Sequence, residues 1–465
     1  MLDRDTFSRR DKILIEKLNI CPAEATSILS KSQIMLCWGK EVVGSAVWQS
    51  AILTAANTAV RCFPGMVVCD GANPGQDMPL AVPFGSAVNF ADALKRIGVR
   101  KPPRAEHTSR IVFGSRRDVC NGLHVTFDGW AAAVGPGEEV RLLEREHNPL
   151  AGVAAGALAV SELFLRIARV NIEATKRTIG MSLWRPELSW DALDAVGMPL
   201  EVVPNEAWLL GLGHLGQAYL WCIGLLPYSD PSDMNLLLND YDTLVTGNWD
   251  SGSISRKRDR GKLKSRVALR WLRARGFSPK LLERPFQKGC QVVGSDPGLG
   301  LCGFDGKGPR EALDQVGFQF VTEAGLGGRS DNFDAISIHS FPNGQKAATK
   351  FWPSSASPSM DESAILENVF YRSVAAHDGC GHMQLASVSA AVPFVGAVAA
   401  TIVLAEPLRI LHGGKRYDSV DVRLESPTEI SAVPSTDESL INISYQSVQS
   451  FWPRQKVDSS AFIKN

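Results

Sequence analysis

Apolar positions recur along the chain with two periods, one typical of strands and the other typical of helices. Residues 3–29 predict a charged, amphipathic helical entry. A strand is predicted at 33–38, a turn and a helix reaching about Val60 follow, and residues 66–70 predict the next strand. Strands that alternate with helices in this way indicate an α/β fold with parallel strands.

The same layout returns between Trp208 and Lys264. An apolar run enters a glycine-rich turn, a helix-like segment follows, and a second apolar run ends in two carboxylates. The glycines are Gly211, Gly213 and Gly216, and the carboxylates are Asp240 and Asp242. Such a turn lets backbone N–H groups at a helix N-terminus approach phosphate, so we expect a phosphorylated ligand here.

The two layouts belong to a predicted internal duplication. Residues 148–167 resemble residues 391–410, and the shared landmarks are Pro149, Gly152 and Glu162 against Pro393, Gly396 and Glu406. The first turn keeps Gly39 and Gly44, but Glu41 stands where the second copy has its middle glycine. A carboxylate at that place repels phosphate and blocks close approach of the backbone. We therefore expect a degenerate N-terminal copy and an intact C-terminal copy.

The predicted boundaries are 1–170 for the inactive copy, 171–200 for a linker, 201–430 for the active copy and 431–465 for a polar tail. The tail is expected to be mobile or to bind a partner. Strands in the active copy are predicted at 281–286, 291–294, 299–304, 317–323, 334–339 and 417–426. Residues 341–379 predict a long functional loop with a helical piece near 361–373.

Composition narrows the class of protein. Hydrophobic residues make up 45% of the chain, charged residues 21%, and the formal net charge is zero, which is typical of a soluble globular protein without a basic footprint for nucleic acid. The basic run from Arg256 to Lys264 is interpreted as a solvated loop and helix start rather than a polyanion site. Residues 386–405 are apolar, but they are rich in Ala, Ser and Gly and contain Pro393, which favours a buried helix over a membrane span.

Cysteine usage and the N-terminus bear on the compartment. Nine cysteines without a CxxC pair predict neither a disulfide framework nor a zinc ribbon. Reduced thiols fit a cytoplasmic protein. The first residues are too charged for a secretory signal.

The order of the motifs resembles the ThiF/MoeB-type superfamily of ubiquitin-activating enzymes. That order is a GxGxxG turn, a DxDT run, an asparagine, a GxxK run, and an aspartate with an arginine five residues later. The elements that carry it are Gly211–Gly216, Asp240–Thr243, Asn248, Gly261–Lys264, Asp305 and Arg310, with FSRR at 7–10 and EAGLGG at 323–328. The resemblance covers most of the chain. Without it, the glycine turn alone favours a nicotinamide-binding Rossmann site.

The resemblance implies two Rossmann-like adenylation folds in one chain and a reaction of a C-terminal carboxylate with ATP. It implies that Asp240 holds the ribose and that Asp305 binds magnesium. Lys264, with Arg9 or Arg10 from the degenerate copy, would offset phosphate charge, and Asp242, Asn248 and Arg310 complete the ATP site. The alternatives are a plain turn aspartate at 305 and an exposed helix lysine at 264. The family arginine three residues after the asparagine is replaced by Ser251, and Arg256, Arg258 or Arg260 are candidates to substitute for it.

The thioester-forming members of that superfamily carry a cysteine before the small-residue helix, and Cys380 stands at this place. A thiolate is the competent nucleophile, and the glycines at 379 and 381 would leave it accessible. His377 and His382 are near enough in sequence to assist it. Two alternatives stay open: a metal site made of Cys380 and the two histidines, or a buried structural thiol.

The function implied by the resemblance is ATP-dependent activation of a ubiquitin-like protein that ends in glycine. The acyl group would pass from adenylate to Cys380 and then to the cysteine of a conjugating enzyme. Within the superfamily, the chain is most similar to the bacterial BilD-type enzymes, which implies a role in antiviral defence; no nucleic-acid or membrane partner is expected. The other hypotheses are activation of a sulfur carrier without a thioester, an NAD-dependent oxidoreductase, and a non-catalytic scaffold.

Overall fold

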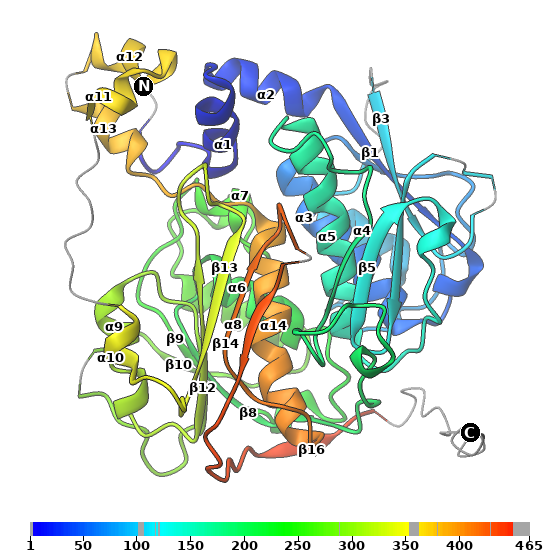
Figure 1. Cartoon of the computed structure of the whole chain (residues 1–465), viewed down its shortest axis with the longest axis vertical. Coiled ribbons are helices and arrows are strands. Elements are labelled where there is room, and N and C mark those ends of the chain that lie inside the picture. Colours follow the sequence, from blue (N-terminus) through cyan, green and yellow to red (C-terminus); the bar gives the residue numbers. More distant parts are fainter. Residues whose placement is uncertain are drawn as a thin grey trace.

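A computed structural model describes residues 3–100, 107–116, 118–119, 121–287, 289–352, 362–378, 380–427 and 429–449. Within these residues the chain forms two large sheets, with helices packed between them (Figure 1). The helices between the sheets are α3 (Ala46–Cys62), α5 (Pro149–Ile167), α6 (His214–Ile223) and α14 (Pro393–Leu411). The mixed α/β architecture predicted from the sequence is confirmed.

The N-terminal sheet has six strands in the order β2-β1-β3-β4-β5-β6. The first four run parallel, and β5 and β6 are antiparallel additions. Their bounds are β1 (Ser32–Trp38), β2 (Val67–Cys69), β3 (His107–Phe113), β4 (Leu123–Asp128), β5 (Ala131–Pro136) and β6 (Ile179–Ser182). The predicted strands at 33–38 and 66–70 are therefore present.

The C-terminal sheet has eight strands in the order β10-β9-β8-β11-β12-β13-β14-β15. The five strands from β10 to β12 run parallel, and the last three are antiparallel additions. Their bounds are β8 (Glu206–Leu210), β9 (Asn235–Asn239), β10 (Lys280–Leu282), β11 (Leu299–Cys302), β12 (Phe320–Leu326), β13 (Ala335–Phe341), β14 (Tyr417–Arg423) and β15 (Ser431–Pro434).

The strand order of the first sheet repeats in the second. The order β2-β1-β3-β4-β5-β6 has the same directions as β9-β8-β11-β12-β13-β14. Helix α5 joins the last two strands of one repeat and α14 joins those of the other. Glu162 and Glu406, matched in the sequence, are both fully buried on these helices. The topology thus contains one arrangement twice, while the boundaries near 170, 200 and 430 remain predictions.

Helices α5 and α14 are long and apolar enough to cross a membrane by length and composition, and both lie inside the protein core. Small residues let α5 approach α3 closely. A Cβ added at Gly152 would collide with the carbonyl oxygen of Val47, and one added at Gly156 would collide with that of Ala51. The expectation of a buried helix near 386–405 is confirmed, with its start at Pro393.

The helical entry consists of two helices, α1 (Arg9–Leu18) and α2 (Pro22–Ser30). The hydroxyl of Ser8 caps α1 by accepting the N–H of Asp11 at 3.1 Å. Asn19 ends α1 in the left-handed conformation, and Pro22 is the first residue of α2. The remaining helices are α4 (Phe90–Ile97), α7 (Asn248–Ser251), α8 (Lys264–Arg273), α9 (Lys307–Glu311), α10 (Ala348–Phe351), α11 (Glu362–Leu366), α12 (Val369–Ala375) and α13 (Gly381–Ala386).

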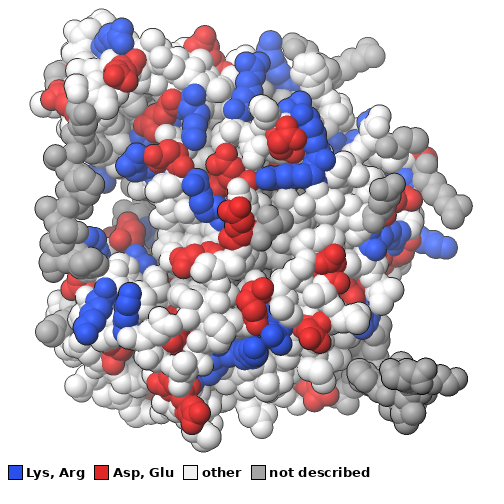
Figure 2. Space-filling model, in the orientation of Figure 1, with Lys and Arg blue, Asp and Glu red and all other residues white. Residues whose placement is uncertain are grey.

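One prediction about an element is wrong, because no strand forms at 291–294. Within the segment predicted to be a polar tail, β15 extends the C-terminal sheet and β16 (Tyr445–Ser447) pairs with β7 (Val202–Pro204). Edge pairing of this kind depends on main-chain hydrogen bonds rather than on a hydrophobic pattern, so polar residues make it too. Figure 2 shows acidic and basic side chains interspersed over one face of the protein.

Candidate active site

A cavity of about 520 Å³ opens at the carboxyl ends of the parallel strands in the C-terminal sheet. Ligands bind at this edge in open α/β sheets. The cavity walls come from α1, from the turn between β8 and α6, and from the segments after β9, β11 and β12. Nine predicted site residues line it: Arg9, Gly211, Gly213, Asp240, Asp242, Asn248, Lys264, Asp305 and Arg310.

The glycine turn brings the N-terminus of α6 to the cavity. Gly211 has a φ of 84°, a conformation that residues with a side chain rarely adopt. Gly213 caps α6, and an added Cβ there would meet no described atom within 4 Å. Gly216 does not line the cavity; an added Cβ would collide with the carbonyl oxygen of Gly211. The third glycine therefore lets the helix pack against the turn, the second leaves room for a ligand, and the first supplies the backbone conformation of the turn.

Asp240 braces the glycine turn from β9. Its Oδ2 accepts the N–H of Leu212 at 2.7 Å, and its Oδ1 accepts the N–H of Asp242 at 2.8 Å. Burial raises the pKa of the Asp240 carboxyl, while Lys264 and the two backbone donors oppose the rise. Each carboxylate oxygen thus holds part of the backbone that surrounds the cavity.

Lys264 is the first residue of α8, and its ammonium group points to the two carboxylates after β9. Nζ lies 2.8 Å from Oδ2 of Asp242 and 3.9 Å from Oδ2 of Asp240. Asn248 begins α7, and its Oδ1 accepts the N–H of Val245 at 2.9 Å. These contacts place one cation and one oriented amide on the cavity wall.

Arg9 reaches the cavity from the N-terminal helix α1. Burial lowers the pKa of its guanidinium, and the carboxylates of Asp305 and Asp250 oppose that shift. Asp305 follows β11, is exposed, and makes no hydrogen bond or ion pair with another described residue. Arg10, the alternative to Arg9, is buried away from the cavity against Asp11 and the carbonyl of Arg61. The structure therefore selects Arg9 as the arginine that crosses to the second copy.

Arg310 lies on α9 beneath the cavity and is almost fully buried. Nη2 donates to Glu323 on β12, and the guanidinium lies 4.5 Å from the ring centre of Trp352. Glu323 also contacts Nδ1 of His339, and no solvent reaches it. Nε of Arg310 is buried without a partner among the described residues. The guanidinium is thus oriented by a carboxylate and an aromatic ring and keeps an unused donor.

Several cavity residues escaped prediction from the sequence, among them His214, Arg284, Phe286 and Phe304. Burial, together with the charge of Arg9, lowers the pKa of His214 to about 3, and Nε2 has no hydrogen-bond partner among the described residues. His214 stands between the second and third glycines, a position that the turn pattern leaves free. Arg284 follows a short strand, and no spacing rule marks it.

The arginines proposed to replace the family arginine at Ser251 do not reach the cavity. Ser251 is buried in α7. Arg256 and Arg258 line a separate pocket, and Arg260 lines a third, smaller one. Those substitutions are therefore not supported, and the arginines on the cavity wall are Arg9, Arg284 and Arg310.

Cys380 is exposed directly before α13 and does not line the cavity. The reading of Cys380 as a buried structural thiol is wrong. His377 bonds the carbonyl of Ser373, and His382 is buried with Nε2 at 3.0 Å from Glu362, so neither contact involves the thiol. The described residues contain no cluster of three or more potential metal ligands, which disfavours the metal reading. The glycine at 379 lies outside the described residues.

Helices α11 to α13, which carry Cys380, dock on α1. Lys12 Nζ donates to the carbonyl oxygen of Ala386 at 2.7 Å and to the hydroxyl of Tyr371 at 3.3 Å. Phe7 stacks on Phe370 with ring centres 5.9 Å apart. The chain then continues into Ser389, which lies in the cavity wall. Helix α1 therefore contacts both the cavity and the cysteine-bearing helices.

The corresponding turn of the N-terminal copy is filled by protein. A Cβ at Gly39 would collide with Oε2 of Glu41, and one at Gly114 would lie 3.0 Å from the same atom. These glycines follow β1 and β3, as Gly211 and Gly303 follow β8 and β11. The carboxylate thus occupies the space that is open in the C-terminal copy.

Two family models match the chain along its length. The model of the BilD N-terminal domain matches residues 33–183, and that of the BilD C-terminal domain matches residues 203–414. The bacterial E1-like protein BilD of Collimonas sp. (strain OK412) is 34% identical over 430 residues, which are 90% of this chain and 91% of the relative. The chain belongs to the BilD family.

The C-terminal BilD match contains Cys380 and every cavity residue except Arg9, which precedes both matched segments. Among solved structures, MccB of E. coli with MccA-N7isoASN is similar at 11% identity over 69% of this chain and 97% of that chain, with a TM-score of 0.35. PaaA is similar at 12% identity over 50% of this chain and 64% of that chain, with a TM-score of 0.32.

Proposed function

We propose that this BilD-family protein uses ATP to activate the C-terminal glycine of a ubiquitin-like protein. The carrier would first become an acyl-adenylate and then a thioester on Cys380, and would finally move to the cysteine of a conjugating enzyme. Membership of a family of bacterial E1-like proteins supports the general class. The observation that carries the proposal is the convergence of nine motif residues, from Arg9 to Arg310, on one cavity.

The size and lining of the cavity suit a nucleoside triphosphate. The open turn at Gly211 and Gly213 and the N-terminus of α6 offer backbone N–H groups to phosphate oxygens. Lys264 and the three wall arginines supply positive charge for phosphates, and Phe286 and Phe304 supply apolar surface for a base. A volume of about 520 Å³ lies in the usual range for small-molecule sites.

In the first step, an oxygen of the carrier's terminal carboxylate attacks the α-phosphorus of ATP. A new O–P bond forms, and the bond from that phosphorus to the pyrophosphate oxygen breaks. The charge that moves onto pyrophosphate faces the fixed cations of the wall, chiefly Arg9 and Lys264. Arg310 is held in place by Glu323 and is positioned to offset the remaining charge.

Magnesium fits the donor set around Asp305. A single exposed carboxylate at a phosphate-sized cavity matches the way Mg²⁺ is commonly bound, by one or two carboxylates together with substrate phosphates. When bound, the ion would neutralise phosphate charge. Asp305 would hold it, and Arg9 lies close enough to balance the carboxylate electrostatically.

The second step uses Cys380. The thiol loses its proton to solvent, the thiolate attacks the acyl carbon, a C–S bond forms and the C–O bond to AMP breaks. Exposure of Cys380 supports this role. Because the thiol does not line the cavity, we infer that helices α11 to α13 and the cavity approach each other between the two steps. The N-terminal copy is assigned no chemistry, since Glu41 fills its turn.

Exchange of radiolabelled pyrophosphate into ATP tests the first step. The exchange requires the purified protein, magnesium and the cognate ubiquitin-like protein. Asp305→Ala is expected to lower exchange about 100-fold or more, as loss of a charge-stabilising group does. Asp233→Ala, which removes an exposed aspartate before β9 outside the cavity, is the matched control and is expected to exchange normally. Equal exchange by both variants would overturn the assignment of Asp305.

A non-reducing gel tests the second step. Wild type and Cys290→Ala should form an adduct with the carrier that a thiol reagent removes, and Cys380→Ala should not. A thiol-sensitive adduct that survives in Cys380→Ala, or exchange without any adduct in wild type, would favour a sulfur-carrier enzyme. Binding of NADH without exchange would favour the oxidoreductase, and the absence of both would favour a scaffold.

A further inference from the structure

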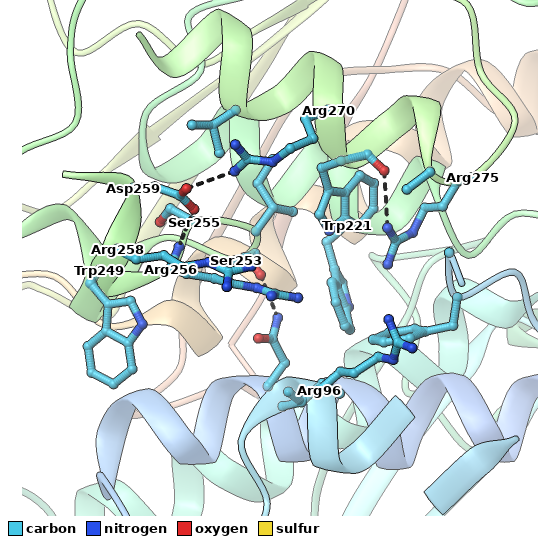
Figure 3. Close-up of a pocket in the computed structure, with 18 of the residues that line it drawn as sticks. Arg96, Trp221, Trp249, Ser253, Ser255, Arg256, Arg258, Asp259, Arg270 and Arg275 are labelled. Atoms are coloured by element: carbon cyan, nitrogen blue, oxygen red, sulfur yellow. Dashed lines mark hydrogen bonds and ion pairs between the residues drawn. The ribbon is translucent and has the colours of Figure 1, made fainter. Parts of the chain in front are cut away.

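A second pocket, of about 350 Å³, lies between the two copies (Figure 3). One wall comes from α3 and α4 of the N-terminal copy, with Asn57 and Arg61 on α3 and Arg96 on α4. The other wall comes from the segment around Ser253 and Arg256, and from α6 and α8. No residue lines both this pocket and the cavity at the glycine turn.

The pocket is strongly cationic. Its lining has one carboxylate, Asp259, which is already bonded to Lys262 at 2.9 Å and to Arg270 at 2.7 Å. Six arginines surround it, and they are Arg61, Arg96, Arg256, Arg258, Arg270 and Arg275. In Figure 3, Arg256 and Arg275 reach into the pocket from opposite sides.

Four of these arginines have no carboxylate within ion-pair distance among the residues that the structure describes: Arg61, Arg256, Arg258 and Arg275. Arg61 is buried and donates to the carbonyls of Trp249, Ser253 and Ser255 instead. Burial lowers its pKa to about 10. Burial, together with the charge of Arg256, lowers the pKa of Arg275 to about 9. Unpaired positive charge in a confined space is costly until an anion arrives.

Two further features indicate a prepared site. The hydroxyl of Ser255 is buried in the lining and has no hydrogen-bond partner in the described part of the chain. The guanidinium of Arg275 lies 3.5 Å from the ring centre of Trp271 and 5.0 Å from that of Phe84, which fixes its plane. A guanidinium that packs against aromatic rings has already lost side-chain conformational freedom before a ligand binds, and it presents its N–H donors in one direction.

We propose that this arginine pocket binds a small anion that contains two or more linked phosphates. Several guanidinium groups in fixed positions suit phosphate oxygens, which accept paired hydrogen bonds, better than they suit single carboxylates. The shared chemistry is that of an inorganic oligophosphate or of a nucleotide. The proposal does not rest on the adenylation activity, because the two pockets share no residue.

A bound anion would connect the copies, since Arg61 and Arg96 belong to one and Arg256, Arg258 and Arg275 to the other. Ligands that bind only the folded protein raise its stability. We therefore expect oligophosphate to raise the unfolding temperature through this pocket. The effect should weaken with salt, because screening reduces the attraction.

The test is isothermal titration calorimetry of the full chain with inorganic tripolyphosphate. Wild type should show two binding events, one at the arginine pocket and one at the glycine turn. The double variant Arg256→Glu/Arg258→Glu, which changes two exposed side chains, should lose one event or weaken it about tenfold or more. Arg273→Glu, an exposed change on α8 outside the pocket, should keep both. Unchanged unfolding midpoints will show that the variants fold.

Further titrants identify the source of the phosphate. ADP that binds the pocket tighter than pyrophosphate indicates a nucleotide, and the reverse indicates an inorganic oligophosphate. Two findings would overturn the proposal. One is an unchanged titration in Arg256→Glu/Arg258→Glu, and the other is a hexaglutamate peptide that binds the pocket when tripolyphosphate does not.

Discussion

The guanidinium of Arg310 and the carboxylate of Glu323 form an ion pair that is almost closed to solvent. The pair connects α9 to β12, and His339 contacts the second carboxylate oxygen. Removing one member of a buried pair leaves the other charge without compensation. Glu323 therefore positions Arg310 beside the cavity without lining the cavity itself.

We predict that Glu323→Gln lowers the free energy of unfolding by roughly 3–5 kcal/mol. It should also raise the KM for ATP in pyrophosphate exchange, because Arg310 is no longer held. Urea unfolding and exchange kinetics measure the two effects. Glu438→Gln, at an exposed site, should change neither quantity. A stable variant with a normal KM would show that Trp352 alone orients the guanidinium.

Substitutions in the glycine turn should separate packing from ligand binding. Gly216→Ala places a methyl group against the carbonyl of Gly211 and should lower stability by about 1–3 kcal/mol, as overpacking does. Gly213→Ala meets no described atom within 4 Å and should leave stability unchanged while weakening ATP binding. Thermal unfolding and nucleotide titration check both variants. Equal destabilisation would contradict the described roles of the two glycines.

Stability should depend on pH through His214. Its pKa is near 3 in the folded protein and near 6.5 in an unfolded chain, so the unfolded state binds the extra proton between these values. Stability relative to His214→Asn should therefore fall as pH drops from 6.5 toward 3, by up to about 1.4 kcal/mol per pH unit. Urea unfolding at several pH values measures the slope. His107→Asn, which is exposed, should retain the slope of the wild type.

Lys12 is expected to affect formation of the thioester on Cys380 more than formation of the acyl-adenylate. Its ammonium group joins α1 to the carbonyl of Ala386 and to Tyr371, and it also donates to Glu16 on the same helix at 2.5 Å. Lys12→Ala should loosen the helices that carry Cys380 and slow formation of the adduct, with pyrophosphate exchange retained. Lys17→Ala, exposed on the same helix, is the control. A parallel fall in exchange and adduct would mean that the substitution displaces Arg9 as well.

Much of the candidate site followed from the order of residues along the chain. The glycine turn, Asp240 and Lys264 come from two neighbouring parallel strands and the helices after them, so local pattern and sheet geometry place them together. Only the family resemblance points to Arg9, because nothing local in the sequence links it to a cavity in the other copy. His214 and Arg284 reach the wall through tertiary packing, which periodicity does not encode.

The structural surroundings of the basic run from Arg256 to Lys264 could be predicted only in part from the sequence. Three of its arginines are exposed, as expected of a solvated loop. The pattern gives no sign that Arg61 and Arg96, more than 150 residues away, lie across a pocket from them. Similarly, β15 and β16 form because partner strands have free edges, a property of the whole fold.

The contact between α5 and α14 has a consequence for attempts to shorten this chain. The two helices pack together in one continuous core, so the first copy supports the second whether or not its own turn binds anything. Removing the first copy would expose the apolar face of α14 that α5 covers, and it would also remove Arg9 from the cavity wall. A fragment that begins near residue 201 is therefore expected to lose both packing support and one of the cavity's cations.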